Sequence, residues 1–291
     1  MTEENKFSFL RKNYREEKPR TSGITEIRGP YYTPVGPNYL DDVFSTMGEY
    51  VDSLKFSGGS FSMMPDNVVR EMIAKAHTYD IEVSTGGFIE YVLIQGPEAV
   101  ESYLEACKSL GFDTIELSCG FISIPTDDWS RLIERVMKMG MKPKPELGIQ
   151  FGAGGDTAAK ILKEEGTQDV GWVIHQAKRF LDQGVPQLMI ESEGITENVQ
   201  EWRVDVIARL IDELGLDKLM FEAADPKVFA WYIKNYGPEV NLFVDHSQIV
   251  QLEALRQGIW GTKSMWGRIL SYNPHPIKRI EYTADRDQAR V

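Results

Sequence analysis

The chain has 291 residues, of which 42% are hydrophobic and 26% are charged, a balance that suits one large α/β domain or two small ones. Its formal net charge of -12 argues against nucleic acid or an anionic membrane as a partner, because both require a basic surface. The only cysteines, Cys107 and Cys119, give neither a disulfide framework nor a zinc-ligand spacing, and no apolar run approaches the length of a membrane span.

Residues 1–22 are polar and charged throughout and do not have the character of a signal peptide. Their composition predicts a flexible N-terminal arm. With reduced cysteines and no targeting segment, we expect a cytoplasmic location.

From residue 23 onward, short β-rich apolar runs alternate with amphipathic helical patterns. The expected strands are 24–29, 52–58, 81–87, 113–120, 141–148, 187–194, 218–224 and 240–246. The expected helices include 65–80, 97–112, 126–140, 170–184, 201–215, 225–237 and 247–258, several of which open on proline or threonine and close on glycine.

Eight strand–helix units in a chain of this length favour an α/β fold of the (β/α)8 TIM-barrel type over an open doubly wound sheet. No GxGxxG motif follows the first strand, which weakens the dinucleotide-binding alternative further. We therefore predict one barrel domain over 23–270 and a C-terminal tail over 271–291. The longest interruption, 148–169, is expected to lie over the mouth of the barrel.

A charged residue stands near the end of seven of the eight strands, flanked by residues that face the opposite way. In a parallel barrel the flanking apolar residues face the helices, so the charges should point inward at the carboxyl end, where the sites of this fold lie. These residues are Arg28, Lys55, Glu116, Glu146, Glu191, Glu222 and Asp245. Glu26 and Lys144 share this parity one step deeper, and Glu90 lies just beyond the third strand.

Three cations, Arg28, Lys55 and Lys144, face six acids of matching parity: Glu26, Glu116, Glu146, Glu191, Glu222 and Asp245. Carboxylates crowded in one cavity repel each other and take up protons unless a cation joins them. Oxygen ligands without histidine or cysteine favour a hard ion, and Mg²⁺ is the ion we expect.

The stretch "SGGS" at 57–60 follows Lys55 directly. Gly58 and Gly59 would let backbone N–H groups approach a phosphate, and Ser60 would add a donor. An ordinary turn remains the alternative, because glycine pairs are common in turns. His246 is the one histidine expected near the mouth, and Cys119 lacks the basic neighbour of a nucleophile.

Seven stretches, taken together and in order, carry a resemblance to a known family. They are "GEYVDSLKFSGGSF", "STGGFIEY", "GFDTIELSCG", "PELG", "LMIESEG", "KLMFEAA" and "LEALRQGIWG". The chain resembles the phosphosulfolactate synthases over about Gly23 to Gly261, and its opening "KPRTSGITEIRGPYY" is similar to the plant heat-stress-associated 32-kDa branch.

The resemblance implies magnesium-dependent addition of sulfite to phosphoenolpyruvate, a carbon–sulfur lyase reaction used in coenzyme M biosynthesis. It implies that Lys55 protonates the carbon next to the substrate carboxylate and that Glu116 assists catalysis. It implies that Mg²⁺ is bound by Glu146, Glu191 and Glu222. It implies that the anionic substrate is bound by Arg28, Gly58, Gly59, Ser60, Lys144 and Arg256.

The sequence departs from the synthases at three anion-binding stretches. "DKG" becomes "IRG" at Arg28, "EGRESG" becomes "ESEGIT" after Glu191, and "RRGLRG" becomes "RQGIWG" at Arg256. A triply anionic substrate with sulfite requires that positive charge.

Three functions therefore stay open: the carbon–sulfur lyase, a Schiff-base aldolase using Lys55, and a non-catalytic barrel of heat-stress physiology. The expected partner is a small anionic substrate rather than nucleic acid or membrane, and a homo-oligomer is left open.

Overall fold

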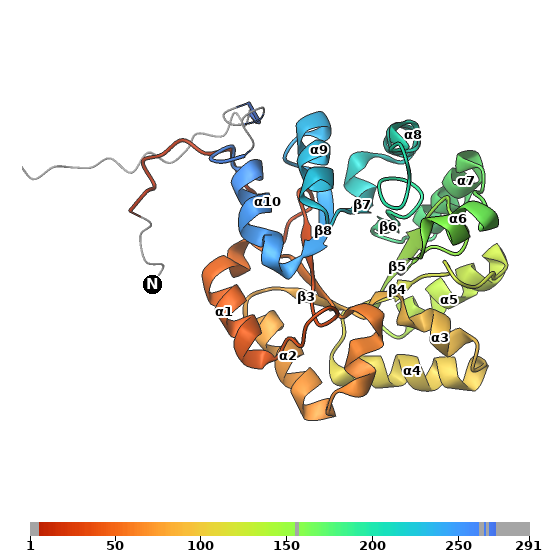
Figure 1. Cartoon of the computed structure of the whole chain (residues 1–291). Coiled ribbons are helices and arrows are strands. Elements are labelled where there is room, and N and C mark those ends of the chain that lie inside the picture. Colours follow the sequence, from red (N-terminus) through yellow and green to blue (C-terminus); the bar gives the residue numbers. More distant parts are fainter. Residues whose placement is uncertain (1–5, 155–156, 262–264, 266–267, 272–291) are drawn as a thin grey trace, which may run out of the picture.

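A computed structural model describes residues 6–154, 157–261, 265 and 268–271. Eight parallel strands close into one barrel in sequence order, and the helices surround them (Figure 1). The strands are β1 Thr25–Arg28, β2 Ser53–Lys55, β3 Glu82–Ser84, β4 Thr114–Leu117, β5 Lys142–Leu147, β6 Leu188–Ile190, β7 Leu219–Glu222 and β8 Asn241–Asp245. The predicted (β/α)8 barrel is confirmed.

The seven helices predicted from amphipathic patterns are present as α2, α4, α5, α7, α8, α9 and α10, and α1, α3 and α6 are additional. The α-helices are α1 Pro37–Met47, α2 Asp66–Thr78, α3 Ile89–Leu93, α4 Pro97–Leu110, α5 Thr126–Lys138, α6 Ala159–Glu165, α7 Val170–Asp182, α8 Val204–Leu214, α9 Pro226–Tyr236 and α10 Ile249–Arg256. Short 3₁₀ turns are η1 Gly48–Tyr50, η2 Ser57–Met63, η3 Gly86–Phe88, η4 Leu216–Lys218 and η5 His246–Gln248. Helix α4 shows the expected ends, with Pro97 in its first turn and a left-handed Gly111 after its last.

Apolar side chains pack on both faces of the barrel wall: one layer lies between the strands and the helices, and a smaller cluster lies inside the barrel. The large outer core lies between strands and helices and includes Ile27, Leu54 and Ile115, which are fully buried. A small inner cluster, Met189 and Met220 with Phe243, fills the barrel itself. Because successive strand residues alternate between these layers, the charged residues that flank outer-core residues must face inward.

The strand register aligns three of the inward charges, and the others lie at or near the carboxyl ends of their own strands. In the backbone register, Arg28 lies opposite Lys55 of β2 on one side and opposite Asp245 of β8 on the other. Glu222 is the last residue of β7, and Glu146 is the last residue but one of β5. The charged side chains thus lie together at the carboxyl end of the barrel.

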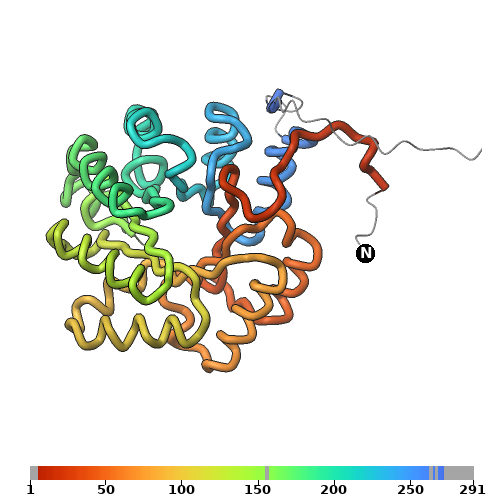
Figure 2. Tube along the Cα trace, turned by 180° about the vertical axis from the view of Figure 1, so that it is seen from behind, coloured from red at the N-terminus to blue at the C-terminus, as the bar shows by residue number. Residues whose placement is uncertain are grey.

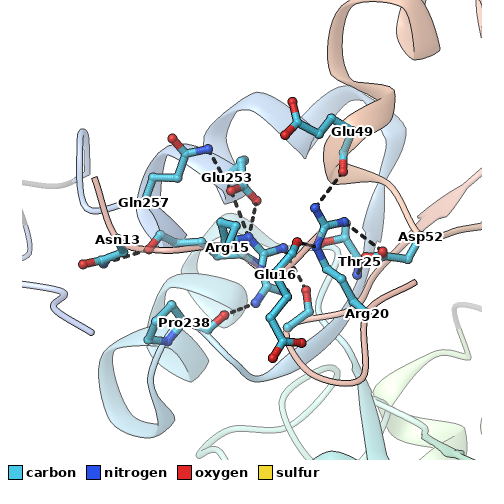
Figure 3. A network of polar contacts seen from close by, with 12 residues as sticks. Asn13, Arg15, Glu16, Arg20, Thr25, Glu49, Asp52, Pro238, Glu253 and Gln257 are labelled. Atoms are coloured by element: carbon cyan, nitrogen blue, oxygen red, sulfur yellow. Dashed lines mark hydrogen bonds and ion pairs between the residues drawn. The ribbon is translucent and has the colours of Figure 1, made fainter. Parts of the chain in front are cut away.

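The N-terminal segment runs beside α10 (Figures 1 and 2), and its contacts are with α10 and with residues that precede the strands. Arg15 forms an ion pair with Glu253 of α10 at 3.0 Å, and Arg20 pairs with Asp52 at 2.9 Å (Figure 3). The side chain of Asn13 donates to the carbonyl of Arg256. Residues 13–20 of the arm predicted over 1–22 thus contact the barrel, because their cations find carboxylates that composition does not reveal.

We expect the Arg15→Met substitution to lower the free energy of unfolding by about 2 kcal/mol, as loss of a charged hydrogen bond does. The loss stays at that level because Gln257 still donates to Glu253 at 2.9 Å. Arg131→Met is the matched control: its ion pair with Asp128 is exposed, so its removal should change stability by less than about 1 kcal/mol. Urea denaturation measures both, and equal losses would contradict a structural role for the arm.

Apart from Ser271, the predicted C-terminal tail lies outside the described residues. Within the described residues, no helix is both long and apolar enough to cross a lipid bilayer.

Candidate functional site

The inward charges surround one cavity of about 910 Å³ at the carboxyl end of the barrel. It is lined by Arg28, Lys55, Glu116, Glu146, Glu191, Glu222, Asp245 and His246, together with loop residues. Each of the seven predicted strand-end charges reaches it, which confirms that the four glutamates of β4 to β7 converge. The convergence follows from a shared parity, since strands of one barrel present the same face inward.

Two lysines and two carboxylates form a buried network at the floor of the cavity, of which Lys55 and Glu116 line the cavity itself. Lys55 Nζ lies 2.8 Å from Glu116 Oε2 and 4.0 Å from Glu26 Oε2. Lys144 Nζ lies 2.6 Å from both oxygens of Glu26 and 3.1 Å from Glu116 Oε2. These two cations therefore balance Glu26 and Glu116. Lys55 also approaches Glu222, with 3.5 Å between Nζ and Oε1.

The charges fix the protonation of the Lys55–Glu116 pair. Burial alone would lower the pKa of Lys55, but attraction to Glu116, Glu222 and Glu26 outweighs it and raises the pKa above its usual range. Burial likewise opposes the charged form of Glu116, yet Lys55 and Lys144 hold the pKa of that carboxyl below its usual range. Lys55 is thus an ammonium group at neutral pH.

Above this floor, Glu146 and Glu191 lack such compensation. Burial raises the pKa of Glu146 well above its usual range, and repulsion from Glu116 and Glu222 adds to the shift. The pKa of Glu191 is raised in the same way by burial and by Glu222 and Glu146. Among the described residues, no side chain donates a hydrogen bond to Glu146. The excess of acid predicted from the sequence is therefore concentrated on the β5–β7 side of the cavity.

Two further glutamates of the lining hold loops and are not free acids. Glu90 accepts hydrogen bonds from the backbone of Gly120 at 3.0 Å and of Phe121 at 2.7 Å, and from the Ser118 hydroxyl. Glu193 accepts from the backbone of Gly154 at 2.8 Å and of Thr157 at 2.7 Å. The role of Glu193 was missed, because nothing local marks an acid whose backbone partners lie nearly forty residues away. Gly154 itself lines the cavity, as expected of the insertion over the mouth.

Arg28 stands on the opposite side of the cavity, among aromatic rings. Its guanidinium carbon lies 5.1 Å from the ring centre of Tyr32 and 5.0 Å from that of Phe243. Within the described chain it forms no ion pair with a carboxylate, and its buried Nε has no hydrogen-bond partner. His246 Nδ1 bonds the backbone carbonyl of Arg28 at 2.9 Å, which positions this strand end. Arg28 is therefore the cation available to an anionic ligand.

The glycine loop after β2 contributes only in part. Ser57 and Gly58 line the cavity, whereas Gly59 and Ser60 do not. Gly58 has φ +59°, and a Cβ there would lie 2.6 Å from the Tyr31 ring, so the close approach needs glycine. Ser60 is buried, and its hydroxyl has no partner in the described structure. The prediction that Gly59 and Ser60 contact substrate is corrected, because neither residue lines the cavity.

A second glycine turn, at Gly86 and Gly87 after β3, lines the same cavity. These two glycines were not among the predicted site residues. The stretch "STGG" resembles "SGGS" in that a glycine pair follows the end of a strand in both, and this pattern could have identified the second turn.

Two predicted substrate ligands lie away from the cavity. Lys144 does not line it and instead supports the floor through Glu26 and Glu116. Arg256 is fully buried at the other end of the barrel, where it donates to the carbonyls of Pro238 and Ile24. Helix α10 runs antiparallel to the strands, so its last residue returns to their amino ends. Binding of substrate by Arg256 is therefore excluded by its place in the fold.

The described residues contain no group of three His, Cys, Asp or Glu side chains already arranged as metal ligands. Glu146, Glu191 and Glu222 offer carboxylate oxygens alone, and two of them carry pKa values raised by burial and mutual repulsion. Mg²⁺ is usually held by one or two carboxylates, with the remaining positions taken by substrate oxygens and water. The donor set fits such an ion.

Comparison with known proteins agrees with this reading of the barrel. Residues 13–262 match the family model described as (2R)-phospho-3-sulfolactate synthase (ComA). The protein HEAT-STRESS-ASSOCIATED 32 of Arabidopsis thaliana is 40% identical over 259 residues, which cover 86% of this chain and 91% of that protein. A phosphosulfolactate synthase of Methanothermobacter thermautotrophicus is 28% identical, with 88% of this chain and 96% of that protein covered.

Solved structures share the fold at low identity. The carboxyl transferase domain of Rhizobium etli pyruvate carboxylase aligns with a TM-score of 0.52 and 9% identity, covering 78% of this chain and 40% of that one. Dihydrodipicolinate synthase from Agrobacterium tumefaciens aligns with a TM-score of 0.50 and 12% identity, covering 81% and 74%. At these identities the likeness concerns the barrel alone.

Proposed function

The chain belongs to the (2R)-phospho-3-sulfolactate synthase family, and from this premise we propose that its cavity carries out magnesium-dependent addition of sulfite to a phosphorylated enol carboxylate such as phosphoenolpyruvate. The observation that carries the proposal is Lys55, a buried ammonium that lines the cavity 2.8 Å from Glu116. Arg28 lines the same cavity and has no carboxylate partner within the described residues.

The addition needs a nucleophile, a place for negative charge and a proton. The sulfur of sulfite forms a bond to the methylene carbon, and the electron pair of the double bond moves to the adjacent carbon. Lys55 donates a proton to that carbon, and bisulfite or solvent restores the proton to Lys55. The phosphate ester is retained, so atoms and charge balance.

The chain's own residues supply the setting for this step. Arg28 would bind an anionic group of the substrate, and the turn at Ser57 and Gly58 would bring backbone N–H groups to its phosphate. Glu116 holds the ammonium of Lys55 in place at the floor. Glu146, Glu191 and Glu222 would hold Mg²⁺, which when bound supplies Lewis-acid stabilisation of charge on the substrate carboxylate.

The Schiff-base alternative loses its physical basis. An amine that attacks a carbonyl must be neutral, which enzymes achieve by lowering the lysine pKa. Burial by itself would lower the pKa of Lys55, but four nearby carboxylates outweigh it and raise the pKa. Reduction with borohydride in the presence of a keto acid should therefore leave Lys55 unmodified.

A non-catalytic role remains the second candidate, and the charge balance of the cavity favours it. Arg28 and Lys55 are the two lysine or arginine residues of the described lining. Nine carboxylate residues line it: Glu90, Glu116, Glu146, Glu191, Glu193, Glu197, Glu222, Asp225 and Asp245. A trianionic substrate would meet repulsion there unless cations accompany it.

Product analysis tests the proposal. With phosphoenolpyruvate, sulfite and Mg²⁺ we expect a new phosphate ester in the ³¹P spectrum, carrying one deuterium at carbon 2 when the reaction runs in D₂O. The synthase of M. thermautotrophicus serves as the parallel control. If this chain yields no ester while the control does, and neither reactant shifts its melting temperature, the non-catalytic role is favoured.

A further inference from the structure

His246 lines the cavity where β8 and β1 meet, and the addition step described above does not use its side chain. Among the three histidines that the structure describes, it is the one in the lining, because His77 and His175 are exposed on α2 and α7. It opens η5 directly after Asp245, the last residue of β8, so the barrel itself positions the ring. A histidine at the carboxyl end of a barrel strand is a candidate for acid–base chemistry.

The imidazole of His246 is held in one tautomer. Its Nδ1 lies 2.9 Å from the backbone carbonyl oxygen of Arg28. Because a carbonyl oxygen can only accept, Nδ1 carries the hydrogen and donates it. In the neutral ring, Nε2 then holds a free lone pair. The ring of Tyr39 packs against the imidazole nearly at a right angle, with 5.1 Å between the ring centres, and this contact fixes the ring plane.

The free nitrogen is accessible from the cavity. Within the described chain no group forms a hydrogen bond to Nε2 of His246, yet, unlike the partnerless Nε of Arg28, this atom is not fully buried. The side chain of His246 is 11% exposed, and the residue contributes to the cavity lining. A ligand that enters this corner therefore meets a hydrogen-bond acceptor that can also take up a proton.

Three titratable or charged groups surround the ring. The carboxylate of Asp245 lies 3.8 Å from Nδ1 and accepts hydrogen bonds from the backbone and hydroxyl of Ser247. Burial opposes the charge of Asp245, but Ser247, His246 and Arg28 hold the pKa of that carboxyl below its usual range. Burial and Asp245 raise the pKa of Tyr39, which is thus a neutral phenol. Asp245 would stabilise an imidazolium, and Arg28 would attract the anion that supplies its proton.

We propose that His246 is a general base for the nucleophile, and that Nε2 accepts the proton of a hydrogen-bearing monoanion, namely bisulfite, held beside Arg28. This role rests on the function proposed above. Carboxylates outnumber lysine and arginine in the lining, so singly charged bisulfite enters more readily than doubly charged sulfite. The nucleophile therefore arrives with a proton that it must lose inside the cavity.

The proton inventory closes without another reactant. The O–H proton of bisulfite passes to Nε2 of His246 while the sulfur forms its bond to the methylene carbon. The electron pair of the double bond takes a proton from Lys55 at the adjacent carbon. The imidazolium then returns one proton through water to Lys55, so both side chains regain their starting state.

Asparagine at position 246 separates this role from a structural one. Its amide N–H can replace Nδ1–H toward the Arg28 carbonyl, but it supplies no base. We expect His246→Asn to keep its melting temperature and to reduce turnover by about a hundredfold at pH 6, the lower end of the usual effect of a general base. The loss should shrink as pH rises, because the nucleophile then arrives ionised. His175→Asn, at an exposed position, is the matched control and should change neither quantity. An unchanged rate, or a loss that is equal at every pH, would overturn the proposal.

Nitrogen NMR of protein labelled in its histidines tests the same nitrogen without turnover. The His246 signals, assigned by their absence in His246→Asn, should show a hydrogen on Nδ1 and none on Nε2. Sulfite at pH 6 should move the Nε2 resonance toward that of a protonated nitrogen, whereas sulfate, an anion without an acidic hydrogen at this pH, should not. A hydrogen on Nε2, no response to sulfite, or equal responses to both anions would contradict a proton-accepting role.

The two sets of data distinguish failure of the base from failure of the function. A sulfite response at Nε2 in a protein that forms no phosphosulfolactate would leave the proton-accepting site in place and remove the proposed reaction. Product formation that His246→Asn leaves intact at every pH would keep the reaction and remove His246 from it.

Discussion

Replacing Lys55 with methionine is expected to reduce turnover by about a hundredfold or more and to lower the free energy of unfolding by about 3 kcal/mol at pH 7. Methionine keeps the length of the side chain and removes the charge. The side chain of Lys55 lies within 4.0 Å of Glu26, Glu116 and Glu222, so its loss leaves buried carboxylates short of a cation. The same substitution removes the proposed proton donor.

Lys144→Met is the control that separates the two effects. Lys144 balances Glu26 and Glu116 as closely as Lys55 does, but it does not line the cavity. We expect a similar loss of stability, about 3 kcal/mol, with turnover reduced less than about tenfold. Urea denaturation and initial rates on both variants decide the matter. A Lys55→Met enzyme that turns over at near the parent rate would end the proposal of Lys55 as proton donor.

The second large effect is expected at Glu146. Burial and the neighbouring carboxylates raise the pKa of this group in the folded state, so the folded protein binds its proton more tightly than the unfolded chain. Its contribution to stability is therefore full at pH values below the ordinary glutamate pKa and is lost as pH rises through the raised value. Glu146→Gln removes this loss and should stabilise the protein at pH 8 by about 1–2 kcal/mol. At pH 4 it should have little effect.

Mg²⁺ should produce a related effect in the unsubstituted protein. An ion that binds only the folded state adds about 2.7 kcal/mol at a hundred times its dissociation constant. The gain should be largest at pH 8, where Glu146 and Glu191 are most nearly ionised, and smaller in Glu146→Gln. Sodium chloride at matched ionic strength controls for screening. If Mg²⁺ leaves the melting temperature unchanged while Glu146→Gln raises it, these carboxylates form a strained cluster and not a metal site.

Much of the barrel could be read from the sequence, because local patterns determine it. Alternation along each strand fixed which residues face inward, and eight strand–helix units left few other folds. That is why Glu116 and Glu222 were placed correctly at one cavity. The strands themselves are shorter than expected; β6 covers only Leu188–Ile190, since pairing ends before the charged residues begin.

Strand alternation is sufficient to specify the inward face of each strand and the excess of acid at one end of the barrel. Which of these charges meet depends on the packing of the whole barrel. Barrel closure and stagger put Lys144 beneath Glu116 and out of the cavity, and the antiparallel course of α10 carries Arg256 to the far end. Partners far apart in the chain, such as Arg15 and Glu253, become neighbours only after closure. Periodicity specifies direction along one element, whereas distance across the barrel depends on how all eight strands pack.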